Sequence, residues 1–158
     1  MALAVLGSCG AGSAEAAVFY SPDGLFVAEF PGPPTFTMTK AKTAKGTPFE
    51  ERRWSTETTD GIWSVAAFLY ATPRGTNYDA AVSGAVAAAR GRLLSDQPIR
   101  QAGSDGREIV VKDGAGILRE RIVSVRGNLY VIAFHGKDAA AAAALAVDEF
   151  LISFEAAG

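Results

Sequence analysis

Cysteine and histidine are almost missing from this chain, which has one of each among 158 residues. A single cysteine excludes an internal disulfide framework, and the two residues are too few for a zinc site built from cysteine and histidine ligands. His135 is the only imidazole available to Ser-His-Asp catalysis, and no G-x-S-x-G turn accompanies it. We therefore predict that the protein is not an enzyme and has no catalytic residues, no metal site and no cofactor.

An excess of positive charge is lacking as well. Fifteen Lys and Arg are offset by seventeen Asp and Glu, which gives a formal net charge of −2. Nucleic-acid binding and attachment to an anionic membrane both favour a basic surface, so the composition disfavours both. No segment has the roughly 18 uninterrupted apolar residues of a membrane-spanning helix. The 49% apolar content excludes general disorder and favours one folded domain.

The segment 1–16 is typical of a targeting signal. It holds small and apolar residues without Lys or Arg, and Ala14-Glu15-Ala16 fits the small-x-small pattern that signal peptidase recognises. We predict cleavage before Ala17, a single α+β domain over 17–158, and a periplasmic or secreted location. A lipobox-like stretch that ends at Cys9 gives the alternative, a membrane-anchored lipoprotein with its lipid anchor on that cysteine.

The rest of the chain alternates between strand patterns and two helical patterns. Asn77 is a good N-cap for a helix over 78–94, and Asp138 is one for a helix from 139 to about 153. Clusters of turn residues separate the other segments and predict hairpins. Strands are expected at 18–20, 25–30, 36–42, 49–56, 62–71, 99–102, 108–112, 117–126 and 129–135.

Two of these strands, 62–70 and 129–134, are apolar on both faces. An antiparallel sheet that leaves one face to water alternates apolar and polar residues, so these strands indicate a sheet covered on both sides. The two helices could supply the covers. We expect an α+β fold, a mainly antiparallel sheet with helices on both faces (an α/β/α sandwich). Trp63 and Phe68 should then be buried on opposite faces of one central strand.

Two hairpins predict specific cross-strand neighbours. A tight turn at Asp113–Gly116, between the strands 108–112 and 117–126, places Glu108 opposite Arg121. A two-residue turn at Gly127-Asn128 places Glu120 opposite His135 on one face. This second pairing predicts that His135 is a structural residue rather than a base or a metal ligand.

The basic clusters of the chain are short and lie among glutamates. One interpretation is that their side chains form cross-strand ion pairs at the margins of a sheet. The other is a docking patch for an acidic partner or an envelope polymer. The candidate residues of that patch are Arg52, Arg53, Arg119 and Arg121.

Four motifs resemble those of small exported bacterial proteins. Residues 19–32 match an F-x-S-x-x-G-F-x-V-x-F-P-G start, Gly106-Arg107-Glu108 matches a G-x-E strand, 127–130 a G-N-x-L-Y-like hairpin, and 150–154 a closing F-L-x-S-F. In these motifs the chain is similar to the PsbP/Mog-like fold. That fold contains photosystem extrinsic subunits, a Ran-GTPase-binding factor and exported domains of unknown role, and it has no catalytic motif of its own.

The resemblance implies an exported, non-catalytic accessory or binding domain of the cell envelope. Its partner would be an envelope protein or polymer that the sequence does not identify. The alternatives are a small exported hydrolase with a dispersed active site and the lipoprotein anchored through Cys9.

Overall fold

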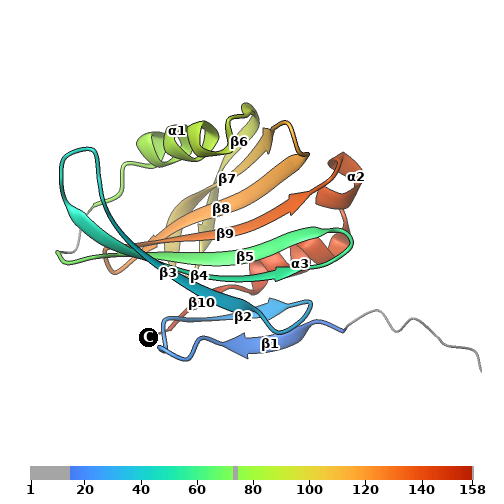
Figure 1. Ribbon diagram of the computed structural model, residues 1–158, viewed down its shortest axis with the longest axis horizontal. Helices are drawn as coiled ribbons and strands as arrows, with labels where there is room; N and C mark the ends of the chain where they lie inside the picture. The colour runs from blue at the N-terminus through green and yellow to red at the C-terminus, as the bar shows by residue number, and fades with distance from the viewer. Residues whose placement is uncertain (1–14, 73–74, 158) are drawn as a thin grey trace, which may run out of the picture.

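Ten strands and three helices make up the part of the chain that the computed structural model describes, residues 15–72 and 75–157 (Figure 1). The strands are β1 (Ala17–Tyr20), β2 (Phe26–Phe30), β3 (Thr35–Lys42), β4 (Pro48–Glu57), β5 (Gly61–Tyr70), β6 (Arg92–Gln101), β7 (Ser104–Lys112), β8 (Ile117–Val125), β9 (Asn128–Gly136) and β10 (Glu155–Ala156). The helices are α1 (Tyr78–Ala89), α2 (Ala139–Ala142) and α3 (Leu145–Ser153). Residues 1–14 of the predicted signal segment, Cys9 included, lie outside the described residues.

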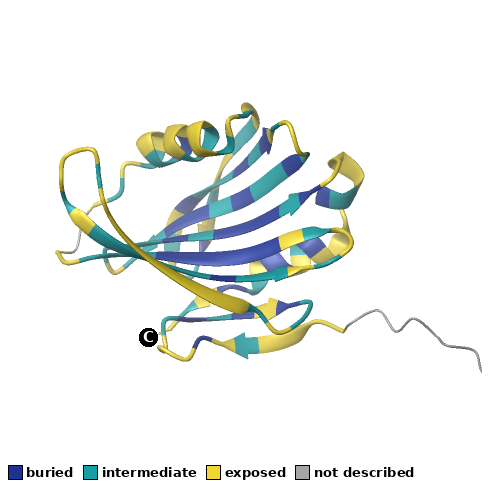
Figure 2. Ribbon diagram, viewed as in Figure 1, coloured by how far each residue is buried: buried dark blue, intermediate teal, exposed yellow. Residues whose placement is uncertain are grey.

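The strands form two antiparallel sheets. The larger one has seven strands in the order β3-β4-β5-β9-β8-β7-β6, and the smaller one has three in the order β1-β2-β10. Within the larger sheet, β3-β4-β5 and β6-β7-β8-β9 are hairpin-connected runs joined by the pairing of β5 with β9. These two inner strands are the ones that the sequence marks as apolar on both faces, and Figure 2 shows them buried along most of their length.

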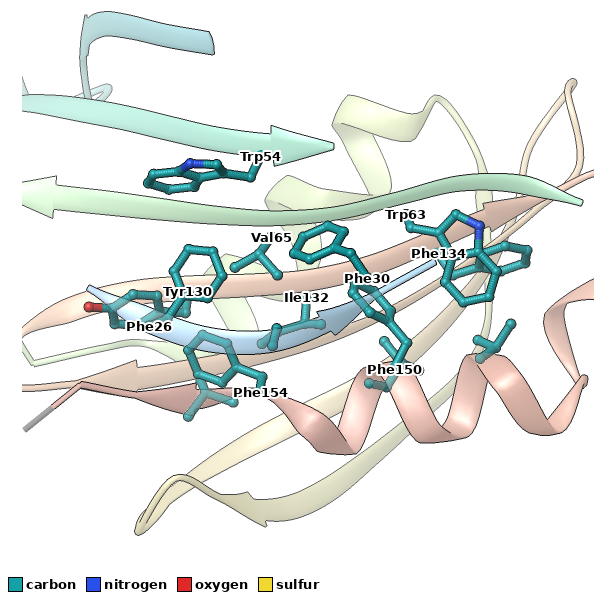
Figure 3. Packing of buried hydrophobic residues seen from close by; sticks show 14 of the residues in the cluster. Phe26, Phe30, Trp54, Trp63, Val65, Tyr130, Ile132, Phe134, Phe150 and Phe154 are labelled. Carbon is teal, nitrogen blue, oxygen red and sulfur yellow. The ribbon is translucent and has the colours of Figure 1, made fainter. Parts of the chain in front are cut away.

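One face of the larger sheet carries the main hydrophobic core. The smaller sheet and α3 cover this face, and aromatic rings interlock between them (Figure 3). Phe150 of α3 meets Phe30 of β2 at a ring-centre distance of 5.3 Å and Trp63 of β5 at 5.4 Å, both edge to face. Edge-to-face contacts of this kind add about 0.5–1.5 kcal/mol each beyond the area they bury.

The opposite face carries α1, which is attached mainly through its first turn. Asn77 caps the helix by accepting the N–H of Ala80 at 3.0 Å. The Tyr78 hydroxyl donates to the backbone carbonyl of Asp105 and accepts the backbone N–H of Ser124. A small apolar cluster then joins the helix to the sheet, consisting of Val82, Ile109, Val111 and Ile122.

The expected α/β/α sandwich is wrong. The protein is mostly antiparallel β, with 54% strand and 18% helix, and its strands form two separate sheets. The apolar pattern of the inner strands shows that a face is covered, but a small sheet can cover it as well as a helix can. On the face opposite α1, the three-stranded sheet shares this role with the short α3.

Both predicted helices are shorter than expected. The first ends at Ala89, because Arg90 adopts a left-handed φ of 51° and Arg92–Gln101 continues as β6. The second is divided into α2 and α3, because Ala144 takes an extended ψ of 144° between them.

The predicted β7–β8 register is confirmed, since Glu108 lies opposite Arg121. The predicted β8–β9 register is wrong: the turn lies one residue earlier in the chain, which moves each cross-strand partner by two residues. The turn uses Arg126 and Gly127, with φ values of 52° and 79°, and it places Glu120 opposite Ala133. A two-residue turn of this kind needs positive φ at both central positions, and glycine takes the second of them here.

Candidate functional site

A cleft of about 670 Å³ lies between α1 and the seven-stranded sheet, and we call it the α1 cleft. Its floor comes from β4, β5, β8 and β9, and its roof is the side of α1 that faces the sheet. Figure 1 shows α1 lying over this face on the side away from β1 and β2. Small-molecule sites commonly have volumes of about 300–1,000 Å³, so the cleft has the size of a ligand site.

Small residues line part of the α1 cleft on both its helix side and its sheet side. The helix contributes Ala81, Gly84 and Ala85, none of which reaches far toward the sheet. Ser64 and Ala133, which lie opposite each other on β5 and β9, form the central floor. Larger residues at the same positions would fill this space, as they do on the opposite face of the sheet. The small side chains at these positions therefore leave the cleft open.

Apolar residues line one end of the α1 cleft. Phe68 of β5 and Leu129 of β9 are cross-strand partners there, with Ile122 and Val131 paired beside them. Trp63 is buried as predicted, whereas Phe68 is only half-buried because it borders open volume. This end of the cleft can hold the apolar part of a small molecule.

Glu120 lies in the floor of the α1 cleft and is its most unusual group. It is only 6% exposed, and among the described residues its carboxylate has no hydrogen bond and no ion pair. Burial raises the pKa of Glu120 to about 7, and the charge of the nearby Arg53 partly opposes that rise. A buried carboxyl without a partner is costly, and such groups in clefts are frequent at functional sites.

Asp113 and His135 form a pair that also lines the α1 cleft. Asp113 Oδ2 lies 3.0 Å from His135 Nε2, while Asp113 Oδ1 accepts the N–H groups of Ala115 and Gly116. Burial opposes ionisation of Asp113, but the two backbone donors and His135 outweigh it, so the pKa of this carboxyl is below its usual value. The predicted partner of His135 was Glu120. The shifted register makes these two residues diagonal neighbours instead.

The four arginines of the predicted docking patch are all held by carboxylates. The pairs are Arg52 with Asp23 and Glu50, Arg53 with Glu51, Arg119 with Glu108 and Asp148, and Arg121 with Glu108. Arg52 and Arg53 are neighbours on β4 and therefore point to opposite faces, and Arg53 lines the α1 cleft. The structure does not bring the four together on one surface, and the docking patch stays a prediction.

Sequence reasoning missed Glu120 as a site residue. The available signal was its position between Leu118 and Ile122 on a strand, where every second residue points to the same side. A carboxylate flanked in this way points inward with the apolar residues. The incorrect hairpin register supplied a false partner, and this removed the reason to regard Glu120 as unpaired.

The described ranges, 15–72 and 75–157, contain neither a cluster of metal ligands nor a membrane-spanning helix. No three Cys, His, Asp or Glu side chains there are close enough together to hold a metal ion. No helix in the same ranges combines the length and apolar character needed to cross a membrane.

No protein family, curated protein or solved structure matches this chain. The likeness to PsbP/Mog-like proteins therefore rests on the sequence motifs alone and stays a prediction.

Proposed function

We propose that this protein is a binding domain that holds one small amphipathic molecule in the α1 cleft. The observation that carries the proposal is Glu120, a buried carboxyl without a partner that faces a cleft of about 670 Å³. Binding sites for small molecules are mostly apolar and contain a few polar groups that orient the ligand. The α1 cleft has this composition. Its apolar end contains Phe68 and Leu129, and its charged end contains Glu120 and Asp113.

The proposal extends the expectation of an exported accessory or binding domain of the cell envelope. The targeting pattern of residues 1–16 supports export, and the cleft supports binding. A periplasmic or secreted location gives access to molecules outside the cytoplasm. The envelope protein or polymer expected as a partner belongs to the same proposal.

A neutral apolar dye tests the site directly. We expect N-phenyl-1-naphthylamine to bind saturably with one molecule per chain and to fluoresce more strongly when it lies against the apolar residues of the cleft. Ala85→Phe places a ring in the open volume and should weaken dye binding at least tenfold. Ala87→Phe adds the same ring to an exposed position of α1 and serves as the matched control. Equal dye binding by both variants and the wild type would remove the cleft as the site.

A second candidate function is favoured by one specific observation. The Asp113–His135 pair and Glu120, with a pKa of about 7, line the same cleft, and such groups serve as general acids and bases near neutral pH. This arrangement supports the alternative of a small exported hydrolase. Turnover of p-nitrophenyl esters that is lost in both Glu120→Gln and His135→Asn would favour it. Dye binding without turnover favours the binding domain.

A further inference from the structure

The directly adjacent strand residues offer Glu120 no group that could pair with it. Its cross-strand neighbours are Ala133 on β9 and Ile109 on β7, while Leu118 and Ile122 flank it along its own face of β8. None of these four side chains can donate a hydrogen bond. The open side of Glu120 is the α1 cleft, where a bound molecule can supply a partner for this carboxyl.

The basic side chains on this face of the sheet are already paired with other carboxylates. The groups concerned are Arg53 with Glu51, Arg107 with Asp79 of α1 and Asp96 of β6, and His135 with Asp113. Arg53 attracts the ionised form of Glu120, but its guanidinium is bonded to Glu51 at 2.7 Å. Among the described residues, no basic side chain forms an ion pair with Glu120, and Arg53 acts on it only from a distance. The charged end of the cleft is therefore more complementary to a cation than to an anion.

We infer, on the basis of the proposed function, that the molecule held in the α1 cleft is an amphipathic amine. Its ammonium group pairs with the carboxylate of Glu120, and its apolar body lies between α1 and the floor residues Phe68 and Leu129. The small residues Ser64 and Ala133 leave room for the ammonium group beside the carboxylate. A charge-assisted hydrogen bond is about twice as strong as a neutral one.

Other head groups fit the charged end less well. An alcohol can form one neutral hydrogen bond with Glu120. A carboxylic acid would bring a second negative charge next to Glu120, and two carboxylates that share a site repel each other. Binding by such an acid would instead require Arg53 to leave Glu51. The three head groups therefore give distinguishable affinities.

A matched series of octyl compounds tests the inference by displacement of N-phenyl-1-naphthylamine at pH 8. We expect n-octylamine, which like a lysine side chain is protonated at this pH, to bind at least tenfold more tightly than 1-octanol, and octanoate to bind most weakly. Glu120→Gln should bring the amine and the alcohol within about threefold of each other. Glu29→Gln, on an exposed residue of β2, is the matched control and should keep the wild-type preference.

Proton release on binding gives a second readout, measured in the wild-type protein and in Glu120→Gln. Before a ligand binds, the pKa of Glu120 in the folded protein is about 7, so most of this carboxyl is protonated at pH 6. Pairing with an ammonium group favours its ionised form. Calorimetry of n-octylamine binding at pH 6, in buffers of different ionisation enthalpy, should therefore show release of most of one proton. His135 and Asp113 are unchanged in Glu120→Gln, so a release that persists in this variant comes from them and counts against Glu120.

The possible outcomes separate the inference from the proposed function. Amine preference that disappears in Glu120→Gln, together with proton release, supports both. Equal binding of the three compounds, or tightest binding of octanoate, overturns the amine while the cleft remains a binding site. Failure of the dye and of all three compounds to bind overturns the proposed function itself.

Discussion

The carboxylate of Asp113 links a turn to a neighbouring strand through His135. Its Oδ2 lies 3.0 Å from His135 Nε2, and its Oδ1 accepts the N–H groups of Ala115 and Gly116, each at 2.8 Å. One side chain therefore closes the β7–β8 turn and connects it to β9, next to the α1 cleft. The lone histidine has a structural partner, although not the one that the sequence suggested.

Replacement of Asp113 should show how much this link contributes to the free energy of unfolding. Asp113→Ala leaves two backbone donors and His135 without an acceptor, so we expect the free energy of unfolding in urea to fall by about 1–3 kcal/mol. Asp113→Asn keeps one oxygen for the backbone donors and should cost less. The pKa of Asp113 is lower in the folded protein, so its contribution is present above its ordinary pKa of 3.8 and is lost as pH falls through the folded value. Equal losses of unfolding free energy in the two variants would contradict the role of Asp113 as an acceptor for the N–H groups of the turn.

Glu120 should make the protein less stable as pH rises. Its pKa is about 7 in the folded protein against 4.5 when unfolded, so the folded state favours the protonated carboxyl. There is no penalty below pH 4.5; the penalty grows between 4.5 and 7 and is complete above 7, at up to about 3 kcal/mol. Glu120→Gln removes the ionisable group. We expect its advantage over the wild type in urea unfolding to grow by this amount from pH 4 to pH 8.

The control for that experiment is Glu29→Gln, whose stability relative to the wild type should be flat over the same pH range. A Glu120→Gln advantage that is constant from pH 4 to pH 8 would show that the carboxyl ionises freely in the folded protein.

Two glycines of the β7–β8 turn, Gly114 and Gly116, should differ sharply in their tolerance of alanine. A Cβ at Gly116 would collide with the carbonyl oxygen of Gly136 on the paired strand, whereas a Cβ at Gly114 would meet nothing within 4 Å. We expect Gly116→Ala to lower the thermal midpoint strongly, with a loss of more than about 2 kcal/mol. Gly114→Ala should be neutral or stabilise by up to about 1 kcal/mol, because it restricts the unfolded chain. Similar midpoints for the two variants would show that β8 can move away from β9.

Glu108 bridges two arginines in the half-buried layer beside α3. Its oxygens lie 2.8 Å from Arg119 and 2.6 Å from Arg121, and its side chain is 18% exposed. Glu108→Gln should lower the free energy of unfolding by about 2 kcal/mol, since hydrogen bonds to charged groups are lost where water is scarce. The exposed pair of Arg100 and Asp105 offers a control, and Asp105→Asn should cost less than about 1 kcal/mol in the same urea titration.

Local sequence signals predicted most of the strands and one hairpin register, but they missed β10 and most of β6. Asp113 followed by glycines is a strong turn signal, and the register of β7 and β8 follows from it. The β8–β9 turn was misplaced because its two central positions, both with positive φ, are Arg126 and Gly127, whereas the prediction used Gly127 and Asn128. Arginine rarely adopts this conformation, so its residue type gives no warning.

The end of α1 was missed for a related reason. Glycine is the usual residue at a left-handed helix end, but here Arg90 takes that conformation. Gly91 is needed one position later, where a Cβ would lie 2.6 Å from the carbonyl oxygen of Lys112. The α1 cleft could not be predicted either, because it depends on how far a helix of small residues stands from the sheet.

The pairing of β5 with β9 has a consequence for how the chain reaches this structure. Each half of the large sheet can form from neighbouring hairpins, which need only short loops to close. Joining the halves brings Ile62 to His135 and Phe68 to Leu129, and so it closes a much longer stretch of chain. Loop closure grows more costly with length, and contacts between distant residues slow folding. We expect this seam to form late, and the α1 cleft, whose floor spans it, to exist only once folding is nearly complete.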